Sequence, residues 1–142
     1  MKRIMSITSI ALFALVSFVT VGSISAQERG VKATVPFDFT VGNKLLPAGT
    51  YTITAENAGV IKIQNSERRV SILSLATQDG KESKTGELVF NKYGDQYFLH
   101  EILCTSASMN MAVPTSKQEN RARVQEASLN SNGQQVYLAL NR

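Results

Sequence analysis

His100 and Cys104 are the only histidine and the only cysteine among the 142 residues, and either side chain could serve in nucleophilic catalysis. They lie four residues apart in a stretch, 97–104, that alternates as a β-strand does. Four residues of strand span about 13 Å, at roughly 3.3 Å per residue, which is too far for a catalytic hydrogen bond. We therefore expect a satisfied structural histidine and a buried cysteine. A single cysteine also excludes an intramolecular disulfide.

The acidic residues do not form a recognisable ligand set. Metal sites need several converging His, Cys, Asp or Glu ligands, and one His with one Cys cannot supply the usual zinc sets. The polar loop 77–86 carries Asp79 and Glu82 but lacks the spacing of a calcium loop. The chain also has no Gly-x-Ser-x-Gly elbow and no glycine-rich phosphate loop. The sequence therefore predicts no catalytic residue, no metal ligand and no cofactor, and it favours a protein that is not an enzyme.

Three aromatic residues, Tyr93, Tyr97 and Phe98, surround a Gly-Asp pair and could form a ligand-binding surface. Packing across the strands of a hairpin would explain them equally well. We favour packing, because aromatic residues are ordinary components of strands.

The N-terminal segment has the three parts of a cleavable secretory signal: a positive start, an apolar centre and a run of small residues. Residues 4–27 contain no ionisable side chain. Residues 1–26 are expected to be removed by cleavage between Ala26 and Gln27, giving an exported protein of the periplasm or the extracellular space. An uncleaved membrane anchor is the alternative, because roughly 20 apolar residues span a bilayer. Interspersed Ser and Thr residues favour cleavage, and contact with the membrane is expected only before it.

The balance of charge does not favour nucleic acid as a partner. The chain has 15 Lys and Arg against 11 Asp and Glu, a net charge of +4, and loss of Lys2 and Arg3 with the signal would lower it to +2. The other bases are scattered, apart from a pair at 68–69 and a group at 117–123. Nucleic-acid binding requires a dense basic face with interleaved aromatics. The group at 117–123 is interpreted as a solvated helix face, although it could also meet an acidic envelope surface.

Alternation of apolar and polar residues predicts a single β domain over residues 27–142. Residues 31–41 alternate with period two, and Pro36 marks either an edge strand or a break between two short strands. The strand at 70–76 is apolar on both faces in part, which we interpret as a central strand. The remaining expected strands are 50–56, 60–65, 88–90, 97–104 and 135–141.

Turn and capping residues separate these elements. Gly94-Asp95 predicts a two-residue hairpin turn that places Phe90 opposite Leu99. Residues 105–114 are small and polar and are interpreted as irregular.

Ser116 followed by Glu119 has the spacing of a capping box and predicts a short helix from about Lys117 to Ala127. The expected fold is all-β: an antiparallel β-sandwich or partly open barrel of about seven strands with one short C-terminal helix.

Two stretches carry a resemblance to a known kind of protein. They are VPFDFTVG at 35–42 continuing to LPAGTY at 46–51, and YGDQYFL at 93–99. Together they resemble a group of small exported bacterial proteins that have a signal peptide, one β domain and no characterised function. The resemblance implies export and a single β domain, and it supplies no functional residues. The Pro-Ala-Gly-Thr-Tyr corner is explained by turn chemistry.

Three functions remain compatible with the sequence. The leading hypothesis is a non-enzymatic exported domain that binds an unknown partner, or has a structural role, at the cell envelope. The second is a carrier of a small apolar ligand in a barrel pocket lined by Phe37, Phe39, Tyr51 and Phe90. The third is a hydrolase whose two carboxylates come from distant positions and converge in one cleft.

Overall fold

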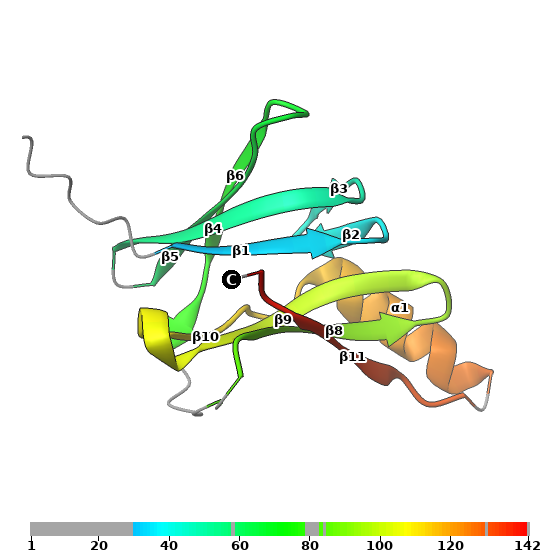
Figure 1. The fold of residues 1–142 in the computed structure, drawn as a ribbon. Helices are drawn as coiled ribbons and strands as arrows, with labels where there is room; N and C mark the ends of the chain where they lie inside the picture. The colour runs from blue at the N-terminus through cyan, green and yellow to red at the C-terminus, as the bar shows by residue number, and fades with distance from the viewer. Residues whose placement is uncertain (1–29, 58, 79–82, 84, 130, 142) are drawn as a thin grey trace, which may run out of the picture.

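A computed structural model describes residues 30–57, 59–78, 83, 85–129 and 131–141, which form two β-sheets and one helix (Figure 1). The expected cleavage position, Ala26 and Gln27, lies outside these residues. The 4-stranded sheet has, in spatial order, β1 (Gly30–Val35), β4 (Gly49–Asn57), β5 (Val60–Asn65) and β6 (Val70–Leu75). The 7-stranded sheet has β11 (Gln134–Ala139), β8 (Glu87–Tyr93), β9 (Gln96–Cys104), β10 (Met109–Ala112) and β7 (Thr77–Gln78), with β2 (Phe39–Val41) and β3 (Lys44–Leu46) attached beside β9.

The predicted fold class is confirmed. The two sheets lie one above the other in Figure 1, and the chain links them on both sides. On one side, β6 runs into β7 through the buried Ala76 and so passes from the smaller sheet to the larger. On the other side, the backbone N–H of Asn141 donates to the carbonyl of Lys32 in β1 at 2.7 Å. These two links curl the sheets into a partly open barrel.

The helix α1 (Lys117–Ser128) begins where the sequence predicts. The Ser116 hydroxyl accepts a hydrogen bond from the Glu119 N–H at 3.1 Å, as a capping residue should. The Glu119 side chain is buried and accepts a hydrogen bond from Asn91 of β8 at 2.9 Å. With Ala122, it is one of the two buried residues of the helix, so a polar contact helps to hold α1 on the larger sheet.

Aromatic rings fill the space between the sheets. Phe39, Tyr51 and Phe90 come from three different strands and are almost completely buried. Phe39 meets Tyr51 edge-on with ring centres 5.2 Å apart, and it meets Phe90 in the same way at 5.4 Å. Edge-on pairs of this kind add to the stability that burial alone provides. The interior is therefore a packed aromatic core.

The Pro-Ala-Gly-Thr-Tyr corner is a structural feature, in agreement with its turn chemistry. The Tyr51 hydroxyl donates to the carbonyl of Pro47, four residues earlier, at 2.6 Å. Gly49 is required for space, because a Cβ there would lie 2.6 Å from the side-chain nitrogen of the buried Asn65. The corner thus fixes how the chain enters β4.

The predicted hairpin is confirmed in its register. Phe90 pairs with Leu99, and Gly94 adopts a positive φ of 57°, which glycine tolerates best. Pro36 breaks the first predicted strand into β1 and β2, which is one of its two expected effects. β2 also touches β9 in parallel, so the pairing is not purely antiparallel.

Three sequence-based expectations about strands are wrong. The polar loop expected at 77–86 begins with a short strand, β7, which pairs with β10. Residues 105–114 are not wholly irregular, because β10 forms at Met109–Ala112 by pairing with β9, a contact that the local composition does not reveal. The strand at 70–76 is not central: β6 pairs with β5 alone and is the edge of its sheet. The apolar residues on both faces of β6 therefore do not mean that both faces are buried.

Candidate functional site

His100 and Cys104 have different surroundings and do not form a catalytic pair. The β8–β9 register shifts so that His100 is the extra residue of a β-bulge. Its Nε2 lies 3.7 Å from a carboxylate oxygen of Glu101, and its buried Nδ1 has no hydrogen-bond partner among the described residues. The expectation of a fully satisfied histidine is therefore not met. Cys104 is buried, as predicted, with its Sγ 3.3 Å from the Ser106 hydroxyl.

The aromatic residues near the hairpin turn are mostly packing residues, as favoured above. Tyr97 stacks on Phe37 with ring centres 3.9 Å apart, and Phe98 is buried. Tyr93 lines a small hollow of about 420 Å³, which it shares with Arg123 and several amide side chains. Burial raises the pKa of Tyr93, and the nearby carboxylate of Glu119 adds to this effect.

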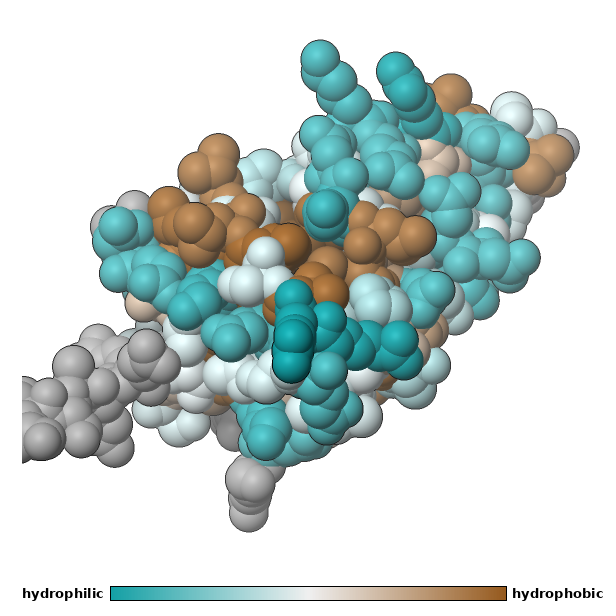
Figure 2. All heavy atoms as spheres, turned by 90° about the horizontal axis from the view of Figure 1, so that it is seen from above, coloured by the Kyte–Doolittle hydropathy of each residue, from teal (hydrophilic) through white to brown (hydrophobic). Residues whose placement is uncertain are grey.

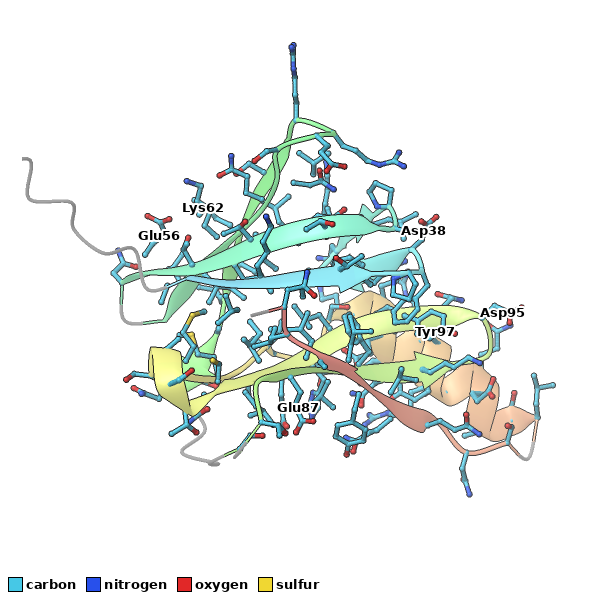
Figure 3. All side chains as sticks on the ribbon, viewed as in Figure 1. Asp38, Glu56, Lys62, Glu87, Asp95 and Tyr97 are labelled. Atoms are coloured by element: carbon cyan, nitrogen blue, oxygen red, sulfur yellow. The ribbon has the colours of Figure 1, made fainter. Side chains whose placement is uncertain are left out.

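The carboxylates are dispersed over the molecule. Figure 3 shows Asp38, Glu56, Glu87 and Asp95 at separate places around the two sheets. Within the described ranges there is no group of three or more His, Cys, Asp or Glu side chains that could hold a metal ion. Among five of the surface hollows on the described residues, none is lined by two carboxylates. Asp79 and Glu82 lie outside the described residues.

The four aromatic residues proposed to line a carrier pocket instead pack on one another. Phe37 contacts Phe90 with ring centres 5.2 Å apart, and the other contacts were given with the fold. None of the four lines any of the same five hollows. An apolar ligand would have to displace packed rings in order to enter there.

The edge of β6 has the most distinctive arrangement. Its pairing with β5 continues as far as a hydrogen bond from the Ala76 N–H to the Gly59 carbonyl at 3.0 Å. In an antiparallel pair, the backbone N–H and C=O groups of successive residues point alternately toward and away from the partner strand. Those of Ser71, Leu73 and Leu75 therefore point away from β5. Within the described part of the chain, no strand other than β5 pairs with β6. The backbone groups of these three residues are therefore directed toward the side where a further strand could pair.

The side chains of this edge are unusually apolar for an exposed position. Leu73 and Leu75 are each 68% exposed. Figure 2, which views the molecule from the side of the smaller sheet, shows hydrophobic residues gathered across the middle of the face between hydrophilic ones. Edge strands are normally protected by charged residues, proline or bulges. β6 contains neither a charged residue nor a proline.

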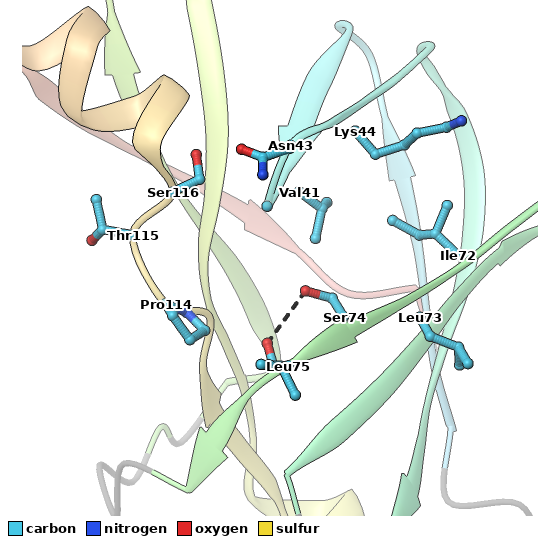
Figure 4. A pocket seen from close by; sticks show the side chains of 11 residues that line it. Val41, Asn43, Lys44, Ile72, Leu73, Ser74, Leu75, Pro114, Thr115 and Ser116 are labelled. Atoms are coloured by element: carbon cyan, nitrogen blue, oxygen red, sulfur yellow. Dashed lines mark hydrogen bonds between the residues drawn. The ribbon is translucent and has the colours of Figure 1, made fainter.

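A hollow of about 690 Å³ runs beside this edge (Figure 4). One wall is β6 from Ile72 to Leu75, and the facing walls are the β2–β3 turn at 41–44 and the segment 114–116 that leads into α1. Apolar lining residues include Val41, Ile72 and Pro114. Lys44 is the one ionisable side chain in the lining, which contains no carboxylate. The hollow has the size of ordinary binding clefts.

Sequence reasoning missed this site although its signal was present. The apolar residues on both faces of 70–76 were interpreted as burial in the middle of a sheet. The same pattern arises when one face packs inward and the other is left exposed, and only the order of the strands distinguishes the two cases.

Comparison with known proteins adds no identification: no family model, no curated protein and no solved structure matches this chain. The resemblance to small exported bacterial β-domain proteins therefore stays a prediction. Within the described ranges, no helix has both the length and the apolar character needed to cross a membrane.

Proposed function

We propose that this chain is an exported, non-enzymatic domain that binds another protein at the cell envelope through the β6 face. We define this face by Ile72, Leu73 and Leu75 and the hollow beside them. The observation that carries the proposal is the apolar edge of β6, which pairs with β5 alone among the described residues and lies open along that hollow. Exposed apolar surface of this kind favours a protein interaction.

Export is supported by the leader pattern of residues 1–26. The envelope location is tested by N-terminal sequencing of protein recovered from the native host. We expect Gln27 as the first residue in the exported fraction. An intact Met1 on the mature protein would contradict export by cleavage.

Binding at the β6 face is tested by selecting a phage-displayed peptide library on the purified mature domain. Peptides enriched on the wild type should lose binding to a Leu73→Asp variant, because a buried unpaired carboxylate at the interface is costly. Tyr137→Asp is the matched control, since Tyr137 is 58% exposed on β11, the edge strand of the other sheet. Equal loss with both variants, or no enrichment on the wild type, would contradict the proposal.

A further inference from the structure

We infer that the partner at β6 is an extended peptide segment that adds to the smaller sheet as a fifth strand, with a carboxylate placed near Lys44. This inference rests on the proposed function and specifies its mode and its partner class. Strand addition supplies affinity through main-chain hydrogen bonds and specificity through alternate side chains.

The free backbone groups have the spacing of a strand ladder. Ser71, Leu73 and Leu75 direct their N–H and C=O groups outward at every second residue, which is the repeat that an added strand requires. The Ser74 hydroxyl donates a long hydrogen bond of 3.3 Å to the Leu75 carbonyl (Figure 4). An incoming N–H could replace this bond.

The charge of the hollow favours a separate segment over a second copy of the chain. The β2–β3 turn and the segment 114–116 face β6 across the hollow, and the lining carries Lys44 and no carboxylate. A second copy that paired through its own β6 would bring a strand without any charged residue. A separate peptide segment can add a strand at the usual spacing of about 4.8 Å and can also carry a carboxylate to Lys44.

The side chains of the segment follow from those of β6. Residues of the peptide that flank Leu73 and Leu75 on the outer face should be apolar, because directly opposed apolar pairs stabilise a sheet. Lys44 is exposed and is the one ionisable residue of the lining. An acidic residue of the peptide, or its terminal carboxylate, is thus the charge that the hollow accommodates.

The test uses heptapeptides of alternating valine and threonine with one glutamate, placed at either end or in the centre, and their glutamine counterparts. Binding to the mature domain is followed by amide chemical shifts in NMR. We expect at least one glutamate peptide to bind with shifts centred on β6. Methylating the peptide nitrogens that face β6 should weaken binding more than tenfold, whereas methylating the alternate set should leave it nearly unchanged. Equal effects of the two sets would overturn strand addition.

The charge is tested with Lys44→Gln against the matched control Lys32→Gln on β1, whose side chain is also exposed. Lys44→Gln should weaken the best glutamate peptide about two- to fivefold and leave its glutamine counterpart unchanged, as expected for an exposed ion pair. Identical effects of the two variants would overturn the inference that a peptide carboxylate lies near Lys44.

The inference and the proposed function fail in different ways. If phage selection yields peptides that depend on Leu73 but the heptapeptides do not bind, the face binds a partner and strand addition is wrong. If both fail, the proposed function is wrong as well. Light scattering of the wild type and of Leu73→Asp tests the remaining alternative. A dimer that forms in the wild type and dissociates in Leu73→Asp would show that a second copy occupies the edge, and would overturn the inference.

Discussion

Strands β6 and β11 are edge strands of the two sheets, yet their exposed side chains and their surroundings differ. β11 exposes Gln135 and Tyr137, and the Tyr137 hydroxyl donates to the Gln135 side chain at 2.8 Å. The chain just beyond β11 is tied down, because the Leu140 N–H donates to the Gly86 carbonyl at 2.9 Å and Asn141 bonds to β1. β6 has exposed leucines instead, and its outer side borders a hollow.

The comparison separates the effect of the core from the effect of the surface. Both strands pack half-buried apolar residues against the same interior, Ile72 from β6 and Val136 from β11. The difference therefore lies in the outward side chains and not in the packing beneath. We use the word clamp for the hydrogen bonds that Leu140 and Asn141 make just beyond β11. Polar outward side chains and such a clamp protect an edge strand from further pairing, whereas apolar outward side chains favour it.

Removing the ring of Phe90 should affect both edges together. Phe90 is fully buried, contacts Phe37 and Phe39, and pairs with Val136 of β11. We expect Phe90→Ala to lower the free energy of unfolding by about 3–5 kcal/mol, measured by urea denaturation. A loss under about 1 kcal/mol would mean that the interior is not closely packed, which would favour the apolar-carrier hypothesis.

The corner at Tyr51 should make the sheet of β6 sensitive to alkaline pH. Burial raises the pKa of Tyr51 above its ordinary value of 10.0. As the pH rises past 10.0, the Tyr51 hydroxyl loses its proton in the unfolded chain before it does so in the folded protein. The free energy of unfolding therefore falls. Tyr51→Phe should cost about 0.5–1.5 kcal/mol at neutral pH through the lost bond to Pro47. The variant should then lose less stability than the wild type between about pH 9 and 11, and parallel pH profiles from urea denaturation would contradict this account.

Releasing the clamp at Asn141 should loosen β11 and leave β6 unchanged. The Asn141 side chain donates to the Thr34 hydroxyl at 3.0 Å, in an exposed position. We expect Asn141→Ala to cost about 0.5–1 kcal/mol. Amide exchange should accelerate in β1 and β11 only, and faster exchange in β6 would show that the two edges are not independent.

Replacing the outer leucines should change the surface without changing stability. Leu73→Thr with Leu75→Thr keeps strand-forming residues at exposed positions and should shift the free energy of unfolding by no more than about 0.5 kcal/mol. Retention on a hydrophobic-interaction column should fall clearly. Tyr137→Thr on β11 is the matched control and should change retention less. A large loss of stability in the double variant would mean that the leucines are structural.

Much of the fold could be predicted because its signals are local. The Gly94-Asp95 turn fixes the register of Phe90 with Leu99, and Ser116 fixes the start of α1. β10 was missed because it exists through pairing with β9, and its own residues are not typical of a strand. The bulge at His100 was missed for a similar reason, since it arises from the register between two strands.

The candidate site could not be predicted because it depends on strand order. Alternation shows which side chains share a face, and it does not show which strands have neighbours on both sides. For β6 the residues were correctly recognised as apolar on both faces, and the neighbour expected on its second side is absent from the described part of the chain. The hollow also needs the segment 114–116, which lies about forty residues further along the sequence.

Amide hydrogen exchange in β6 measures whether the edge of this strand is open to a further strand. In the free domain of residues 27–142, the N–H groups of Leu73 and Leu75 should exchange rapidly, whereas those of Ile72 and Ser74, which point toward β5, should be protected. Adding the best heptapeptide should protect Leu73 and Leu75 as well. Protection of Leu73 and Leu75 in the free domain, or exchange unchanged by the bound peptide, would contradict an open, strand-accepting edge.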